Sequence, residues 1–221
     1  MESINPSFYP ATRAGAATEN FINYKLGGPH RLFQLKVTEA RKESIPGVGN
    51  KYYITSSMKD LVNERPAVSC TAEILYYQSD QQKAPDVSFN LQTELENYTL
   101  EKDIEFYDRM KALPQPLKAT DIPDKFGNVA ADMEPVWHLA LAACGYVKWQ
   151  NSTEDTFYAM ALIKSVKQKK RQDTALEFHY VMLIHEMVTQ EMIPWQIDIL
   201  WDPWQGIKIE NQVRLPKSCC S

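Results

Sequence analysis

The sequence predicts an α+β fold of two similar halves, each a single helix clasped by a curved antiparallel sheet of four strands. Alternating apolar and polar residues mark strands, most clearly near the end of the chain. Each half opens with an amphipathic stretch of helical period, and the order of elements repeats. Since a sheet with one apolar face needs a cover, we expect the helix of each half to supply it.

The first half begins with a helix and continues with strands. Apolar residues recur on one stripe between Ala11 and Tyr24, and the Gly27-Gly28-Pro29 sequence ends the helix. Four strand candidates follow, bounded by turn residues: Leu32–Ala40, Tyr52–Leu61, Ala67–Tyr77 and Val87–Leu91. The polar stretch Gln78–Asp86 is predicted to be a loop.

A further helix is predicted from Thr99 to Leu113. Thr99 can cap it, and acidic residues near its start and basic residues near its end suit the helix dipole. The stretch Lys118–Asn128 is rich in turn residues and is predicted to be irregular. We therefore divide the chain into a first subdomain (1–97), a linker helix (98–117) and a second subdomain (118–221), with the halves docked through the linker helix.

The second half repeats this order. A helix capped by Asp132 is predicted to run to about Trp149. The hairpin Leu176–Asp202 follows, with Thr189-Gln190-Glu191 as its polar tip. Its flanking strand candidates are Thr156–Lys167 and Ile207–Val213.

The two halves can be aligned along the sequence. Lys51–Tyr77 aligns without a gap to Leu176–Asp202, which places Tyr53 on Phe178, and Tyr24 aligns with Tyr146. We interpret this as an internal duplication. The identities are few, so two unrelated β-rich units are the alternative.

Composition limits the function classes. With 221 residues, 44% of them hydrophobic, the chain can bury a substantial core. A formal net charge of −4 argues against nucleic acid or an anionic membrane as the main partner. The start of the sequence lacks the basic and apolar segments of a secretory signal, so we expect a cytoplasmic protein, or one released without the usual signal.

The four cysteines do not form a disulfide framework. Cys70 and Cys144 lie in strand-like and helix-like stretches and are predicted to be buried and reduced. Cys219 and Cys220 end the chain in a sequence that is not a prenylation box, and their state is left open.

No catalytic or metal-binding motif is complete. His185-Glu186 begins like a zinc-protease helix, but the second histidine of His-Glu-x-x-His is replaced by Thr189, and the stretch is strand-like. Nucleophile elbows, phosphate loops and dinucleotide-binding motifs are absent from the sequence. We expect no enzyme activity, no metal and no cofactor.

Two features suggest binding to another molecule. A basic run of Lys164, Lys167, Lys169, Lys170 and Arg171 could bind a polyanion, although a solvated hairpin that protects a sheet edge is the simpler interpretation. The hairpin tip could insert into a concave partner, as a rigid loop loses little entropy on binding.

A helix followed by four antiparallel strands, present twice, resembles the cystatin fold in tandem. Longer strings along almost the whole chain are similar to the latexin family: Asn20–Tyr24, Pro29–Arg31, Cys70–Glu73, Ile122–Val129, Trp149–Thr156, Gln190–Gln196 and Arg214–Lys217. The resemblance implies a tight-binding, reversible, non-catalytic inhibitor of zinc metallocarboxypeptidases of the A and B type. It also implies a mainly cytoplasmic location, and we expect a monomer.

In that family the inhibitor occludes the active-site funnel, and the zinc belongs to the target enzyme. The resemblance carries the target-contact role onto one segment of the second half: His185, Glu186, Thr189, Gln190, Glu191 and Met192. Cystatins that block papain-like enzymes carry Gln-x-Val-x-Gly in the first hairpin turn. Neither Ser44–Gly49 nor Lys169–Asp173 contains that glutamine, so cysteine-protease inhibition is an alternative within the inhibitor class, and a scaffold or polyanion-binding module is the alternative outside it.

Overall fold

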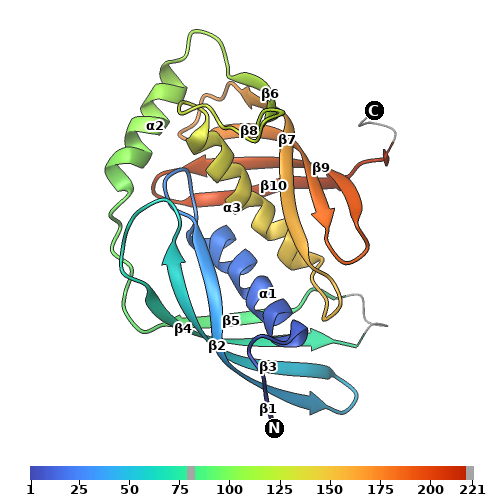
Figure 1. The fold of residues 1–221 in the computed structure, drawn as a ribbon. Coiled ribbons are helices and arrows are strands. Elements are labelled where there is room, and N and C mark those ends of the chain that lie inside the picture. Colours follow the sequence, from blue (N-terminus) through green and yellow to red (C-terminus); the bar gives the residue numbers. More distant parts are fainter. Residues whose placement is uncertain (79–82, 218–221) are drawn as a thin grey trace.

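The computed structural model describes residues 1–78 and 83–217, which form two antiparallel sheets and three helices (Figure 1). The predicted loop Gln78–Asp86 lies partly outside the described residues, and Cys219 and Cys220 lie wholly outside them. None of the described helices has the length and apolar character needed to cross a membrane. The predicted α+β class of two similar subdomains is confirmed.

Each half has the order strand, helix and four strands. The first half contains β1 (Glu2–Ile4), α1 (Tyr9–Leu26), β2 (Phe33–Ile45), β3 (Gly49–Asp60), β4 (Val68–Tyr77) and β5 (Asp86–Leu91). The second contains β6 (Lys118–Ile122), α3 (Glu134–Gln150), β7 (Tyr158–Lys169), β8 (Leu176–Glu186), β9 (Glu191–Asp202) and β10 (Gly206–Arg214). The helix α2 (Leu100–Ala112) lies between the two halves in sequence.

Each sheet has five strands, not the four predicted. The additional strands are β1, which pairs with β2, and β6, which pairs with β7. The prediction that Lys118–Asn128 is irregular is therefore wrong for its first five residues. Both strands are too short to show an alternating pattern in sequence, and only their neighbours in the sheet identify them.

The predicted alignment of the halves slips by one residue in one strand. Tyr52 pairs with Ile74, and Phe178 pairs with Ile199. Tyr52 and Phe178 are both fully buried, so Tyr52 rather than Tyr53 is the equivalent of Phe178. The segment from Phe178 to Ile199 is one residue shorter than that from Tyr52 to Ile74, and a slip of one residue exchanges the two faces of a strand.

The predicted helix caps are only partly correct. The residue before α3 is Met133 rather than Asp132, because a turn that begins at Ala130 already supplies the first carbonyl acceptor. Thr99 does precede α2, but its hydroxyl donates to the Asp103 side chain at 2.8 Å instead of accepting from the helix backbone.

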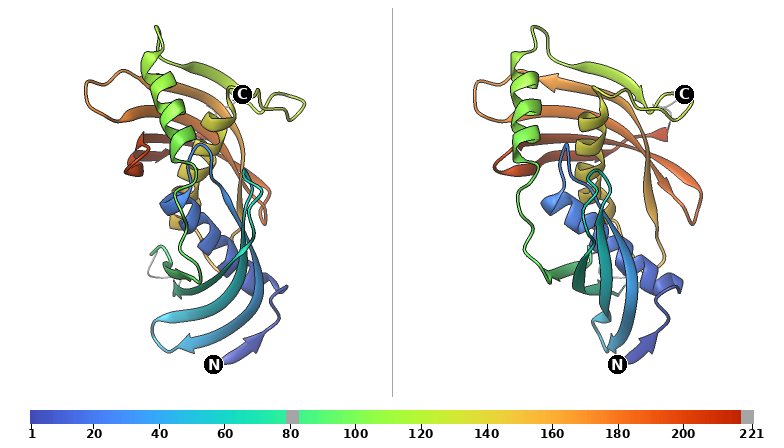
Figure 2. Two further views of the ribbon diagram at one scale, coloured as in Figure 1. Left: turned by 90° about the vertical axis from the view of Figure 1, so that its left-hand side faces the viewer. Right: turned by 60° about the vertical axis from the view of Figure 1, so that its left-hand side comes forward.

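The linker helix α2 packs on the second half. Phe106 and Met110 belong to the same buried cluster as the second sheet, and the Phe106 ring lies 5.6 Å from that of Trp201. Both views in Figure 2 show α2 running beside the second sheet. The helix also touches the first half, because the His30 ring lies 2.8 Å from the Asp103 carboxylate and 6.3 Å from the Phe106 ring. The prediction that the halves dock through this helix is therefore correct only in part, while the division of the chain at residues 97 and 117 stays a prediction.

The main contact between the halves is made by α1 and α3, which pack directly against each other. The rings of Tyr24 and Tyr146, aligned from the sequence, lie 4.9 Å apart, and those of Phe21 and Trp149 lie 4.7 Å apart. A Cβ atom at Gly145 would lie 2.5 Å from the carbonyl oxygen of Asn20. The helices can approach this closely because residue 145 has no side chain.

A polar contact joins the halves beside the helices. The Glu154 carboxylate accepts hydrogen bonds from Tyr52, from Asn50 at 2.9 Å and from Lys42 at 3.2 Å. Burial alone would raise the pKa of Glu154, but these bonds outweigh it and lower the pKa. Glu154 is therefore charged at neutral pH and holds three side chains of the first sheet against the second half.

Replacing Gly145 with alanine tests the helix contact. Helix propensity alone would make Gly145→Ala stabilising by about 1 kcal/mol. Because the added methyl would collide with the backbone of α1, we expect a net loss of about 1–3 kcal/mol instead. Thermal unfolding measures the difference, and a higher Tm for the variant would contradict the packing described here.

Candidate protein-binding hairpin

The β8–β9 hairpin projects from the second sheet and forms the orange loop at the right of Figure 1. Its strands pair from Leu176 opposite Trp201 to Glu186 opposite Glu191, so Met187–Gln190 form the loop. Every second residue of β8 is buried beneath the sheet. The core therefore anchors the hairpin along its whole length.

Glu186 shapes the loop from within. It is only 4% exposed, and its carboxylate accepts backbone N–H groups from Phe157 at 3.0 Å, Val188 at 3.1 Å and Thr189 at 2.6 Å. Burial alone would raise the pKa of Glu186, but these hydrogen bonds outweigh it and lower the pKa to about 2. The predicted contact role of Glu186 is therefore corrected to a positioning role, because the residue has almost no surface to offer a partner.

Gln190 completes the loop. Its φ of 60° lies in the left-handed region, and its side-chain amide donates to the Met187 carbonyl at 2.6 Å. This local bond offsets part of the cost of a left-handed conformation in a residue other than glycine. The loop thus has a defined backbone shape without contact from a partner.

The tip is more apolar than the sequence suggested. Met187 is 38% exposed, Val188 54% and Met192 40%, while Thr189 and Gln190 are also exposed. Sequence reasoning missed Met187 and Val188 because they continue an apolar strand without a break. The sequence did contain a signal for the turn at Met187 and Val188. Glu186 ends an apolar strand, and an acid in that position can accept the N–H groups of a following turn.

The other predicted contact residues flank the tip. His185 and Met192 face each other on the outer side of the sheet, where His185 is half-buried. Glu191 is half-buried and forms ion pairs with Arg214 and Lys217, both at 3.0 Å. The structure therefore places Thr189 and Gln190 at the tip and His185 and Met192 on the outer face, while Glu191 lies opposite Glu186 on the other face of the hairpin. The contact role of these residues stays a prediction.

Buried acids shape two further turns in the same way. Asp60 accepts from the N–H groups of Val62 and Asn63, and Asp202 from those of Trp204 and Gln205. As at Glu186, the donors lie two and three residues after the acid. These turns carry exposed apolar residues too, Leu61 at 56% and Trp204 at 63%.

His185 and Glu186 cannot share a metal ion, because neighbouring strand residues point to opposite faces of the sheet. Within residues 1–78 and 83–217, no group of three or more His, Cys, Asp or Glu side chains is placed to hold a metal.

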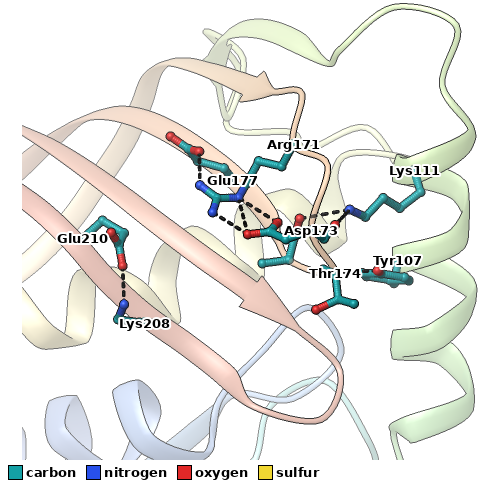
Figure 3. Close-up of polar contacts among 9 residues, drawn as sticks. Tyr107, Lys111, Arg171, Asp173, Thr174, Glu177, Lys208 and Glu210 are labelled. Atoms are coloured by element: carbon teal, nitrogen blue, oxygen red, sulfur yellow. Dashed lines mark hydrogen bonds and ion pairs between the residues drawn. The ribbon is translucent and has the colours of Figure 1, made fainter.

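Two of the five basic residues of the run, Lys169 and Arg171, pair with neighbouring acids, and Figure 3 shows Arg171 between Asp173 and Glu177. Arg171 pairs with Asp173 and with Glu177, and Lys169 pairs with Glu177 at 3.0 Å. Lys111 of α2 donates to the carbonyls of Asp173 and Ala175. The hydrogen bond from Arg171 is the main reason why the pKa of Asp173 falls to about 2. The turn therefore combines a solvated ion-pair network with basic residues, Lys167 and Lys170, for which the described residues supply no ion pair.

Glu186→Gln tests the positioning role. Glutamine offers one carbonyl oxygen in place of two carboxylate oxygens, so we expect a loss of about 1–3 kcal/mol and a Tm lower by roughly 2–10 °C. The folded pKa of Glu186 lies below its ordinary value of 4.5, so its stabilisation is present above pH 4.5 and is lost as the pH falls toward 2.

The Tm difference between the wild type and the variant should therefore shrink on acidification through that window. Glu210→Gln is the control, because Glu210 lies on β10 and pairs only with Lys208 among the described residues, at 2.6 Å. Equal Tm differences for the two variants at pH 7 would contradict a special role for Glu186.

The chain has relatives across nearly its full length. The family model described as Latexin matches residues 4–219. Latexin of Mus musculus is 48% identical over 215 residues, and latexin of Homo sapiens is 46% identical over 215 residues; each alignment covers 97% of this chain and 97% of the relative. Ovocalyxin-32 of Gallus gallus is 32% identical over 95% of this chain and 76% of its own length. The chain belongs to the latexin family.

Proposed function

We propose that this protein is a tight-binding, reversible inhibitor of zinc metallocarboxypeptidases of the A and B type. The β8–β9 hairpin blocks the mouth of the enzyme, and the zinc ion belongs to the target. The observation that carries the proposal is the hairpin itself, with its backbone held internally by Glu186 and its tip exposing Val188. Membership of the latexin family, together with the resemblance stated from the sequence, supports this choice of target.

The hairpin suits inhibition because its shape is fixed before binding. The N–H groups of Val188 and Thr189 are satisfied by Glu186, so the loop does not need a partner to order it. A rigid loop loses little conformational entropy on binding, which leaves more of the interaction energy as affinity. Met187, Val188 and Met192 supply apolar area for a concave surface.

The hairpin also explains how the inhibitor would escape cleavage. A carboxypeptidase cuts the bond before a free C-terminal carboxylate, whereas residues 187–190 are an internal loop that returns into β9. The protein can therefore fill the funnel without presenting a scissile bond. We also propose that the protein has no enzyme activity, acts as a monomer and is located in the cytoplasm.

The alternatives have less support. The turn between β2 and β3 lacks the glutamine that papain-like enzymes require of a cystatin. Polyanion binding through the β7–β8 turn would have to displace the ion pairs of Lys169 and Arg171 with Glu177.

Titration of carboxypeptidase A with the protein tests the proposal, and Val188→Glu locates the contact. A charge at the tip would have to be desolvated in the enzyme mouth, so we expect Val188→Glu to raise the inhibition constant at least tenfold, about 1.4 kcal/mol. Leu61→Glu is the matched control, since Leu61 follows a buried acid on the equivalent turn of the first half and is 56% exposed.

The control should leave inhibition unchanged, and both variants should unfold within about 0.5 kcal/mol of the wild type. No loss of carboxypeptidase activity at micromolar inhibitor would rule out the proposed target. Equal weakening by the two variants would show that the contact does not lie at the hairpin tip.

Reversing the remaining charges of the basic turn separates inhibition from polyanion binding. We expect Lys167→Glu with Lys170→Glu to leave the inhibition constant unchanged, because the β7–β8 turn and the β8–β9 loop lie at opposite ends of β8. Weakened inhibition in this double variant, measured in the same titration, would place the basic turn in the interface.

A further inference from the structure

The strand β2 has an edge that is only partly covered. On one side it pairs with β3 from Phe33 to Ile45. On the other side its neighbour is β1, which pairs only with Ala40, Arg41 and Lys42. The segment Phe33–Glu39 therefore has a strand partner on the β3 side alone.

Side chains of α1 cover the first part of this edge. The Asn23 amide pairs with both the N–H and the carbonyl of Phe33, each at 2.8 Å, in the manner of a neighbouring strand. One turn earlier in the helix, Glu19 accepts the N–H of Leu35 at 2.8 Å. These two residues mark the outward-facing backbone positions of β2, and the next such position is Val37.

A cavity of about 580 Å³ lies along this part of the edge. A Cβ atom at Gly15 would lie 2.6 Å from the Val37 side chain, so the bare backbone of α1 keeps the helix close to the strand. Phe157, from the segment before β7, closes the cavity from the second half. The residues that line the cavity include Pro6, Gly15, Ala16, Glu19, Val37 and Phe157.

The second half of the chain shows which strand occupies the equivalent position beside β7. Val37 and Ile163 are equivalent, because each precedes a bulge and pairs with equivalent strand residues, Ser56 and Met182. In the second half β6 continues past the bulge until Ile122 lies opposite Ile163.

In the first half the corresponding strand stops earlier. The last pair of β1 is Ile4 with Ala40, and Pro6, two residues later, has no N–H to donate. The place that Thr120 and Ile122 fill in the second half, opposite Ser165 and Ile163, is therefore open in the first, and we call it the β2 slot: the edge from Val37 to Glu39 with the cavity beside it.

We propose that the β2 slot binds an extended segment of a partner protein, which adds a short antiparallel strand to β2 and places a basic side chain against Glu19. Backbone hydrogen bonds to the free edge give such strand addition its affinity, and side-chain pockets give it specificity. Lys36 also lines the cavity, but it alternates with Leu35 and Val37 onto the other face of the sheet and is exposed, where solvent screens its charge.

The carboxylate of Glu19 provides the charge complementarity. Only one hydrogen bond reaches it from the described residues, although a carboxylate can accept about four. Burial, the largest effect, raises the pKa of Glu19, while the bond from Leu35 and the charge of Lys148 act in the opposite direction. An arginine or lysine beside Glu19 would stabilise its charged form.

This inference stands apart from the proposed inhibition. The β2 slot lies between α1 and β2, whereas the inhibitory contact lies on the β8–β9 loop. A peptide bound in the slot should therefore leave carboxypeptidase titration unchanged, and failure of either proposal leaves the other standing.

The test uses the whole protein, labelled with ¹⁵N, and the probe acetyl-Thr-Ile-Thr-Arg-Thr-amide. We expect the peptide to shift the backbone amide signals of Gly15, Lys36 and Val37 and to slow hydrogen exchange of the Val37 amide. Replacing the arginine of the probe with norleucine should weaken binding about tenfold. Glu19→Gln should abolish that difference while keeping an acceptor for Leu35.

N-methylation of the probe at isoleucine removes one backbone donor and should also weaken binding about tenfold. The proposal is overturned if millimolar probe leaves these amide signals unchanged, or if the N-methylated probe binds equally well. It is also overturned if the same signals shift with protein concentration alone, which would identify a second copy of this chain as the occupant.

Discussion

Close packing between α1 and α3 determines how the two halves of this protein are placed. At Gly145 a methyl group would lie 2.5 Å from the Asn20 carbonyl oxygen, so no side chain at residue 145 would fit between the two helices. The Glu154 carboxylate then ties Lys42, Asn50 and Tyr52 of the first sheet to the second half. Because the contact combines close-packed backbone with a hydrogen-bonded charge, each half limits movement of the other, and the hairpin of the second half projects from a stiff body.

Hydrogen-bonded buried charges also hold three of the turns. Asp60, Glu186 and Asp202 are buried acids, and a buried carboxylate is costly unless it is hydrogen-bonded. Each accepts N–H groups two and three residues ahead, which satisfies the charge and fixes the turn together. Apolar residues can then stand exposed on these turns without folding back onto the sheet. At the β8–β9 loop this gives a tip that is ordered before any partner arrives.

The two halves share one order of elements but differ at one sheet edge. Each half repeats strand, helix and four strands, yet the edge that β6 covers in the second half is left open beside Val37 in the first. On α1, Asn23 and Glu19 reach this edge with their side chains. A sheet edge needs partners for its backbone groups, so one copy can complete itself while the other keeps a place for a ligand.

The sequence by itself determined the elements that depend on local pattern: the helices, the long strands, the duplicated order and the position of the hairpin, because each has a period that side chains reveal. It also located the predicted contact residues at one end of the hairpin, since residues next to a turn stay together in any hairpin, although the two strands present them on both faces. Only the tertiary structure decided the rest. The short strands β1 and β6 exist through pairing with distant residues, and the inward turn of Glu186 depends on the N–H of Phe157, 29 residues away. The docking of the halves mainly through α1 and α3 depends on the shape of two helix surfaces, which no pattern within one segment can specify.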